Sequence, residues 1–302
     1  MRLNIEELSA ERGKRVTSNF EQRRKRLAIV TGGTRGIGRA ISERLAADGF
    51  DLLLNYCADV KSSQATSQSL QDKYDCDVVC VSGDISQTKT RDKLFTEYDK
   101  NLKATHDLSA IVHNAGQYVG ITSQNGLGLK HEKIMAFGDG SILTKDGNVD
   151  LTQMHYYQKL YGDAYIDLCE RGLARMKYSG GSLVGISSGG CTLHYRPSPG
   201  YDMPGTGKCT MEYAMRLFAL RAGMRNVNCN VIIPGVTSTD AWENLSKIGG
   251  DKKMKQKLEK LSPMGGTCPL DIGKVVAFLC SSDGRPITGM SIPVDNGIHL
   301  KL

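Results

Sequence analysis

A glycine-rich turn between a short apolar run and a helical pattern limits the folds open to this chain. The apolar run is residues 27–30, the turn contains Gly32, Thr34, Arg35, Gly36 and Gly38, and Ile37 opens a helical pattern that ends at Gly49. Glycines allow a tight turn, and the start of a helix offers free N–H groups and the positive end of a dipole. This strand–turn–helix unit predicts a dinucleotide-binding α/β fold.

Further apolar runs alternate with helical patterns along the rest of the chain. The expected strands are residues 51–55, 78–81, 110–112, 182–186, 228–233 and 291–294, and the expected later helices are 156–176, 208–224 and 270–280. This alternation requires a parallel sheet covered by helices on both faces. We therefore predict a single Rossmann-type, doubly wound α/β domain with about seven strands, since no internal repeat indicates a second unit.

Two segments do not follow this alternation of strands and helices. Residues 1–26 form a basic N-terminal extension in which eight Arg/Lys and four Glu leave a charge of +4, so we place the dinucleotide-binding domain at 27–302. Residues 118–153 are rich in Gly, Asp, Asn and Ser and are expected to be a surface insertion. Asp146-Gly147 lies between two short β-prone runs there, which is a hairpin signal.

Composition excludes several classes of protein. The 302 residues are 40% hydrophobic and 24% charged, and no apolar stretch is long enough for a membrane span. The nine cysteines are odd in number and scattered, without the spacing of a zinc site, so we expect reduced thiols, no metal and a cytoplasmic location. The charge of +7 is not accompanied by a nucleic-acid-binding motif, so no nucleic-acid partner is expected.

The chain from residue 27 to 294 resembles the short-chain dehydrogenase/reductase family, and several segments beyond the glycine loop carry the resemblance. The matching residues are Asp84 and Ile85 after the third strand, Asn114, Ala115 and Gly116 after the fourth, Pro234, Gly235 and Val236 after the sixth, and Thr239. The resemblance implies that Asp84 and Ile85 hold the adenine, that Asn114–Gly116 line the cofactor cleft and that Thr239 holds the nicotinamide carboxamide. It also implies a homodimer or homotetramer.

The end of the second strand bears on the choice of cofactor. Enzymes that use NAD commonly have an Asp or Glu there to bind the adenosine 2′-hydroxyl, whereas this chain has Asn55. Arg35 in the glycine loop can pair with a 2′-phosphate. We therefore predict NADP(H) rather than NAD(H), although Asp59 lies close enough in the sequence to favour NAD.

Catalysis in this family depends on a tyrosine beside a lysine, whose positive charge lowers the tyrosine pKa and holds the nicotinamide ribose. Counting back from Pro234 places the lysine at Lys208, but Pro204 occupies the usual tyrosine position. The nearest upstream tyrosine is Tyr201. The resulting Tyr-x6-Lys spacing resembles the enoyl-acyl-carrier-protein reductases, which reduce the C=C bond of an enoyl thioester.

The sequence is compatible with two enzymatic functions and with one non-enzymatic function. Residues 157–162 lack the Asn that carbonyl reductases use in a proton relay, which favours an enoyl reductase acting on a small-molecule thioester of coenzyme A or a carrier protein. Ser188 occupies the catalytic serine position, which favours a carbonyl reductase or alcohol dehydrogenase. Pro204 also admits a non-catalytic NADP-binding protein. Tyr195 is a candidate second tyrosine, and we expect His113 to have a structural role.

Overall fold

The computed structural model describes residues 24–116, 142–177, 180–189, 191, 202–239 and 254–301. Tyr195, Tyr201 and residues 118–141 of the predicted insertion lie outside the described residues. The strands are β1 (Lys25–Thr31), β2 (Phe50–Tyr56), β3 (Val78–Ser82), β4 (His106–His113), β5 (Gly181–Ile186), β6 (Val227–Pro234) and β7 (Ser291–Val294). They form one parallel sheet in the order β3-β2-β1-β4-β5-β6-β7, which confirms the predicted seven-stranded fold.

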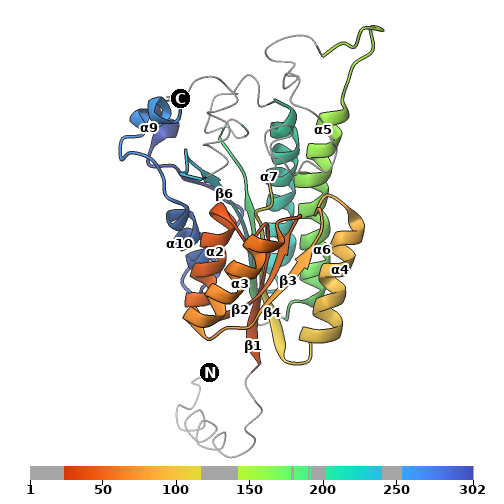
Figure 1. The fold of residues 1–302 in the computed structure, drawn as a ribbon, viewed down its shortest axis with the longest axis vertical. Coiled ribbons are helices and arrows are strands. Elements are labelled where there is room, and N and C mark those ends of the chain that lie inside the picture. The colour runs from red at the N-terminus through yellow and green to blue at the C-terminus, as the bar shows by residue number, and fades with distance from the viewer. Residues whose placement is uncertain are drawn as a thin grey trace, which may run out of the picture.

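Helices cover both faces of this sheet (Figure 1). One face is covered by α2 (Gly36–Ala47), α3 (Val60–Tyr74) and α10 (Pro269–Leu279), and the other by α4 (Thr88–Glu97), α5 (Thr152–Tyr157), α6 (Ala164–Arg175) and α7 (Asp202–Gly223). Short helical segments η1 (Tyr98–Leu102), η2 (Gln158–Asp163) and η3 (Ile298–Leu300) and the helix α9 (Met254–Leu261) complete the described elements. Each face buries its own apolar cluster, as expected for a doubly wound sheet.

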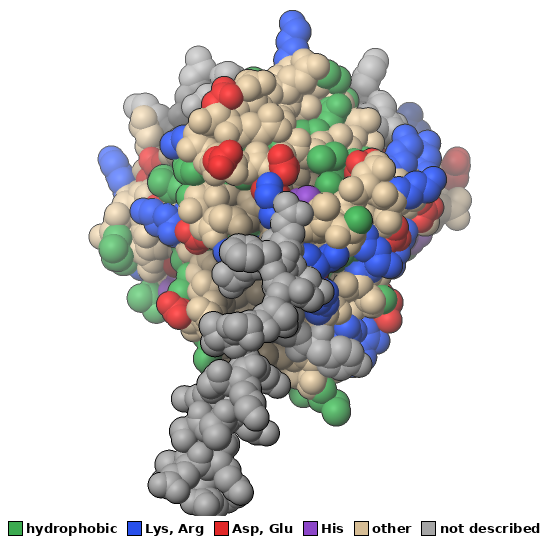
Figure 2. All heavy atoms as spheres, turned by 90° about the horizontal axis from the view of Figure 1, so that it is seen from below, with side chains coloured by type: hydrophobic (Ala, Val, Ile, Leu, Met, Phe, Trp, Pro, Cys, Tyr) green, Lys and Arg blue, Asp and Glu red, His purple; other side chains and the backbone are tan. Residues whose placement is uncertain are grey.

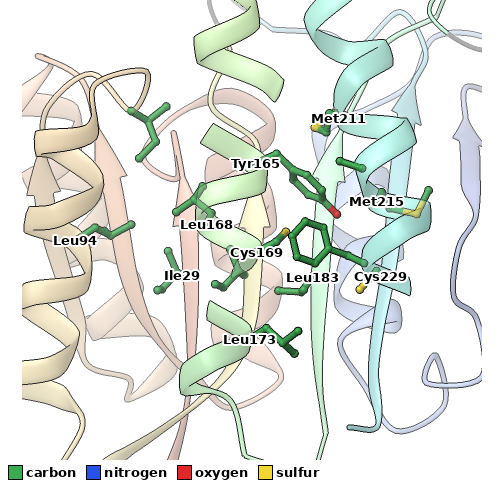
Figure 3. Close-up of a cluster of buried hydrophobic side chains, with 14 of the residues drawn as sticks. Ile29, Leu94, Tyr165, Leu168, Cys169, Leu173, Leu183, Met211, Met215 and Cys229 are labelled. Carbon is green, nitrogen blue, oxygen red and sulfur yellow. The ribbon is translucent and has the colours of Figure 1, made fainter. Parts of the chain in front are cut away.

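The larger of these clusters fixes α6 and α7 against the sheet. Leu168, Cys169 and Leu173 of α6 point toward Leu183 of β5, and Met215 of α7 reaches the same layer (Figure 3). Their side chains are almost fully removed from solvent. At roughly 1.5–3 kcal/mol for each buried large apolar side chain, this layer holds α7 in a fixed position beside the end of β5.

Several boundaries differ from the sequence predictions, and β4, for example, begins at His106 rather than at residue 110. β1 begins at Lys25 because its N–H donates to the carbonyl of Thr105, so part of the predicted extension belongs to the sheet. α7 begins at residue 202 rather than 208, because Pro204 lies in the first turn, where a helix does not need its N–H. The predicted helix 156–176 is interrupted by a π-helical segment, η2.

The hairpin predicted in the insertion is confirmed within its described part. Leu143 and Val149 form an antiparallel bridge, and Gly147 adopts φ +77° in the turn between them. The N–H of Thr144 donates to the carbonyl of Asn148 at 2.8 Å. α5 begins at Thr152, so the last two residues of the predicted insertion belong to that helix.

Candidate active site

The carboxyl ends of the parallel strands bring most of the predicted site residues to one edge of the sheet. The glycine loop follows β1, and Gly32 and Gly36 adopt φ +62° and +53°, which side chains other than hydrogen disfavour. A Cβ on Gly38 would lie 1.9 Å from the carbonyl oxygen of Gly32. The loop therefore needs these glycines to turn into α2 and present the N-terminus of that helix.

Asn114, after β4, ties the central strands to the glycine loop. Its side-chain amide donates to the carbonyls of Thr31 (3.1 Å) and Gly32 (3.2 Å), while its backbone N–H and that of Ala115 both donate to the Thr31 hydroxyl at 3.0 Å. Gly116 follows and is exposed at the same edge. β1 and β4 are also where the strand order reverses, the position at which doubly wound sheets bind ligands.

His113 is structural, as the sequence analysis expected. Burial, followed by the charge of Lys208, lowers its pKa to about 3, so the imidazole is neutral. Its Nε2 lies 3.0 Å from the carbonyl oxygen of Leu160. A carbonyl oxygen can only accept a hydrogen bond, so the single ring proton is on Nε2, and Nδ1 accepts from the Thr31 hydroxyl at 3.0 Å. Leu160 lies in η2, where the π-helical turn leaves its carbonyl available.

The strand ends of β2 and β3 form the part of the site predicted to hold the adenosine, here called the adenosine end. Two of the predicted residues there have buried side chains that support the fold. The Asn55 amide is buried and donates to the carbonyls of Val81 (3.2 Å) and Gly83 (3.0 Å), so it joins β2 to β3. The Ile85 side chain is buried in the core. Asp84 is partly exposed beside them, and its carboxylate accepts from the N–H of Ser86 at 2.9 Å.

Two further charged residues at this end are Arg35, which is exposed, and Asp59, which is partly exposed. Arg35 precedes α2 in an extended conformation. Asp59 caps α3, and its two oxygens accept from the backbone N–H (3.0 Å) and the hydroxyl (2.7 Å) of Ser62. Those hydrogen bonds, with Arg35 nearby, lower the pKa of Asp59. The carboxylate that favoured NAD in the sequence is therefore occupied as a helix cap.

The segment after β6 closes the other end of the edge. Gly235 follows Pro234, and a Cβ on it would lie 2.6 Å from Cα of Asp295, so only glycine fits there. Val236 is buried, and its carbonyl accepts from the N–H of Thr267 at 3.1 Å. Thr239 comes close to the glycine loop: its methyl carbon lies 3.7 Å from the place that a Cβ on Gly36 would occupy.

Lys208 is buried at the second turn of α7. Its ammonium group donates to the carbonyl of Ile186, the last residue of β5, at 2.5 Å, and lies 4.1 Å from the centre of the Tyr161 ring. Burial lowers its pKa to about 8, while Cys191 and Glu212 act in the opposite direction. A lysine with a pKa this close to neutrality at the edge of a sheet is typical of a functional site.

Ser188 follows β5 beside this lysine. Its hydroxyl oxygen lies 3.6 Å from the sulfur of Cys191. The preceding residue, Ser187, is buried and donates to the carboxylate of Glu212 at 2.5 Å, and Ser291 of β7 donates to the same carboxylate at 2.9 Å. Burial raises the pKa of Glu212. Ser188 and Lys208 therefore lie at the same strand end, whereas the position of Tyr201 lies outside the described residues.

Sequence reasoning missed Tyr161 and Glu212. Tyr161 lies in η2, in the stretch noted only for lacking an asparagine, and its ring contacts the Lys208 ammonium. Glu212 follows Lys208 by one helical turn, a spacing that places two side chains on the same face of a helix. That spacing was a readable signal for Glu212, but the contact of Tyr161 depends on the packing of η2 against α7.

The opposite edge of the sheet has a different chemistry. A cavity of about 940 Å³ there is lined by Arg24, Arg26, Lys177 and Arg285 among others, and Lys and Arg side chains gather on this face (Figure 2). Asp107 pairs with Arg24 and with Lys177. Asp51, Asp77 and His106 also cluster at this edge, with Lys25 bonded to both carboxylates.

Comparison with known families identifies the fold. The model of the family described as "Enoyl-(Acyl carrier protein) reductase" matches residues 144–299, more than half of the chain, and the KR domain model matches residues 27–123. The chain belongs to the short-chain dehydrogenase/reductase superfamily. It is therefore an oxidoreductase. No described helix of this reductase is long and apolar enough to cross a membrane.

Several similar proteins are named as reductases. The hydroxynaphthalene reductase-like protein Arp2 of Metarhizium brunneum is 26% identical, over 90% of this chain and 94% of its own. The tetrahydroxynaphthalene reductase of Pyricularia oryzae is 25% identical, over 90% and 89%. The solved structure of the angucycline C-6 ketoreductase LanV with bound NADP is 25% identical, with a TM-score of 0.71 over 91% of this chain and 96% of that chain.

Proposed function

We propose that the chain is an NADPH-dependent carbonyl reductase that acts on a cyclic or aromatic ketone. The main observation behind this proposal is that Lys208 is buried at the end of β5, where Ser188 also lies. The glycine loop that would hold a dinucleotide follows β1, so it lies at the same carboxyl-terminal edge of the parallel sheet. The names of the hydroxynaphthalene reductases and of the angucycline ketoreductase support a ketone substrate more than an enoyl thioester.

Each residue has a separate task in this reaction. NADPH, when bound, supplies the hydride. The Lys208 ammonium would bind the nicotinamide ribose and lower the pKa of Tyr201, which the sequence spacing assigns as the proton donor to the carbonyl oxygen. The Ser188 hydroxyl would donate a hydrogen bond to the same oxygen. Leu160 and Ile186 provide the carbonyls that hold His113 and Lys208 in place.

The preference for NADPH rests on the adenosine end of the edge. Arg35 is exposed next to the glycine loop. The two carboxylates described at this end are both engaged, since Asp59 accepts from Ser62 with both oxygens and Asp84 accepts from the N–H of Ser86. An adenosine 2′-phosphate would meet a guanidinium rather than a free carboxylate there. Binding of NADP by LanV supports the same choice.

Enoyl reduction is the second candidate function. The Tyr-x6-Lys spacing supports it, and so does the description of the family model that covers residues 144–299. In that reaction, Tyr201 would stabilise the enolate oxygen of a thioester carried by coenzyme A or a carrier protein. Ser188 would have no required part, which makes it the residue that discriminates between the two reactions.

The deciding experiment follows NADPH oxidation with 2-tetralone, acetoacetyl-CoA and crotonyl-CoA, using the wild type, Ser188→Ala and Tyr201→Phe. We expect turnover of a ketone that falls by about 10²-fold or more in both variants, as for loss of an acid or an oxyanion donor. Turnover of crotonyl-CoA that survives in Ser188→Ala would instead establish enoyl reduction. Tight NADPH binding without turnover of a wider panel of ketones and enones would favour a non-catalytic protein.

We also propose that the protein forms a homodimer or homotetramer in the cytoplasm. Tyr213, Leu217 and Leu220 of α7 are exposed at intervals of four and three residues, so they share one face of the helix, and the exposed Met224 follows directly after its last residue. A continuous apolar stripe of this kind is typical of a protein interface. The nine free cysteines fit a reducing compartment.

A further inference from the structure

Two cysteines lie side by side next to the catalytic groups, and neither has a part in the proposed reaction. Cys209 directly follows Lys208 in α7, and its thiol donates to the carbonyl oxygen of Cys191 at 3.0 Å. The side chains of the two cysteines also form a hydrogen bond with one another. They come from segments 18 residues apart, since Cys191 lies in the loop after β5.

The surroundings of the two thiols differ in a way that suits a reaction between them. Cys209 is exposed, whereas Cys191 is partly buried and its sulfur lies 3.6 Å from the Ser188 hydroxyl oxygen. The hydrogen bond from the Cys191 thiol lowers the pKa of Cys209 to about 7, and the same bond raises the pKa of Cys191. Cys209 is therefore the more acidic and the more exposed of the two thiols, and thiolates are the reactive form.

We propose that Cys191 and Cys209 form a peroxide-sensitive dithiol that closes to a disulfide at the active site. The Cys209 thiolate attacks hydrogen peroxide, so an S–O bond forms and the O–O bond breaks, and the departing hydroxide takes up a proton and leaves as water. The Cys191 sulfur then attacks the resulting sulfenic acid, so the S–S bond forms, the S–O bond breaks and a second water leaves. Two thiols are oxidised and one peroxide is reduced to two waters.

Closing the bond would disturb the catalytic groups. A disulfide requires the sulfur atoms to approach to about 2.05 Å, closer than two hydrogen-bonded thiols. Closing this bond requires the two side chains to shift, and the Cys191 sulfur is the atom that lies 3.6 Å from the Ser188 hydroxyl oxygen. This part of the inference rests on the proposed function, because it concerns turnover. A shift of about 1 Å at a catalytic group can cost about 100-fold in rate, so we expect at least a tenfold loss that dithiothreitol reverses.

The other exposed cysteines provide matched controls. Cys57 and Cys268 are both exposed. Burial raises the pKa of Cys57, so its thiolate is scarce near neutral pH. Cys268 accepts the N–H of Leu270 at the start of α10. Cys268→Ser keeps that cap and removes one exposed thiol outside the Cys191–Cys209 pair.

The test is made on the full chain, first reduced and then treated with equimolar hydrogen peroxide at pH 7.5. We expect two of the nine thiols to be lost, and non-reducing peptide mass spectrometry to join the Cys191 and Cys209 peptides. Cys268→Ser should behave as the wild type. Cys191→Ser should leave a sulfenic acid on Cys209 that dimedone traps, and Cys209→Ser should lose no thiols.

Peptide mapping separates this inference from the proposed function, since it needs no substrate. A cross-link without any change in turnover would contradict the effect on catalysis alone. Equal thiol loss in Cys209→Ser, or dimedone labelling spread over other cysteines, would overturn the dithiol itself.

Discussion

The Lys208 ammonium lies 4.1 Å from the centre of the Tyr161 ring, and the two residues come from different helical segments packed against each other. The electron-rich face of an aromatic ring stabilises a nearby cation. Burial has the opposite effect on Lys208, because it penalises the charged form and lowers the pKa to about 8. Tyr161 therefore helps to keep a buried lysine protonated at neutral pH.

The first prediction concerns the stability of the protein as a function of pH. The pKa of Lys208 is about 10.5 in the unfolded chain and about 8 in the folded chain. Between these two pH values the lysine takes up a proton when the chain unfolds, so a lower pH favours unfolding. Stability contributed by this residue should rise as the pH increases through that window. Lys208→Met should remove this dependence and raise the free energy of unfolding at pH 7 by about 1–3 kcal/mol.

Urea unfolding of both proteins at pH 7 and pH 9.5 measures this effect. Tyr161→Leu serves as the companion variant, because loss of the ring should lower the Lys208 pKa further and move the window to lower pH. Equal pH dependence in the wild type and Lys208→Met would show that the titration of Lys208 is not linked to folding.

The second prediction concerns Glu212, whose carboxylate joins β5, α7 and β7 through Ser187 and Ser291. Burial raises the pKa of Glu212 in the folded protein. The stability that this residue contributes is therefore lost as the pH rises from its pKa in the unfolded chain through its pKa in the folded chain. Glu212→Gln removes the charge and keeps polar partners for the serines, so thermal unfolding at pH 7 should show equal or higher stability. Glu212→Ala should be less stable by about 1–3 kcal/mol, because the buried hydroxyl of Ser187 loses its acceptor. A larger loss in the Gln variant than in the Ala variant would contradict this assignment.

A third prediction concerns the packing of α7 on the neighbouring helix. A Cβ on Gly207 would lie 2.4 Å from the carbonyl oxygen of Tyr157, a backbone atom that cannot turn aside. Gly207→Ala should cost about 1–3 kcal/mol of stability and reduce turnover, because the helix that carries Lys208 must move. Gly223→Ala in the last turn of the same helix is the control, since nothing lies within 4 Å of its Cβ position. Thermal melts should show it unchanged or more stable, by at most about 1 kcal/mol.

Much of this fold was predictable because its signals are local. The glycine turn, the alternation of apolar runs with helical patterns and the Asp146-Gly147 hairpin each lie within one short segment of sequence. The start of α7 was missed because Pro204 argues against a helix except in its first turn. The η2 segment was missed because a shift of hydrogen-bond partner by one residue changes no apolar period.

The layout of the candidate site was predictable where a residue's position depends on the backbone. Gly32, Gly38, Asn114 and Gly235 have the close contacts that their positions in the sequence imply. Asn55 was assigned to the cofactor site, but its amide turns toward β3, a direction that the sequence does not encode. The contacts of Glu212 with Ser291 and of Cys209 with Cys191 arise from tertiary packing of distant segments, so no local pattern could have shown them.

The fourth prediction separates the two nicotinamide cofactors. Arg35→Ala should weaken NADPH binding by about tenfold, because the 2′-phosphate loses a charge-assisted partner, and should leave NADH binding nearly unchanged. Arg39, exposed one turn later on α2, provides a control of equal charge, and Arg39→Ala should change neither affinity. Fluorescence titration of the bound dihydronicotinamide measures both constants. An equal loss for NADPH and NADH in Arg35→Ala would place this side chain at the pyrophosphate rather than at the 2′-position.

The fifth prediction concerns the apolar stripe on α7. Leu220 and Met224 are 80% and 92% exposed, which is costly for two large apolar side chains on adjacent turns unless another surface covers them. Leu220→Glu would place a carboxylate in a subunit contact and should convert the oligomer to a monomer in analytical ultracentrifugation. Phe278 of α10 is 44% exposed and lies on the other side of the sheet, so Phe278→Glu tests whether any added charge dissociates the protein. A wild type that sediments as a monomer, or an oligomer that survives Leu220→Glu, would rule out α7 as the interface.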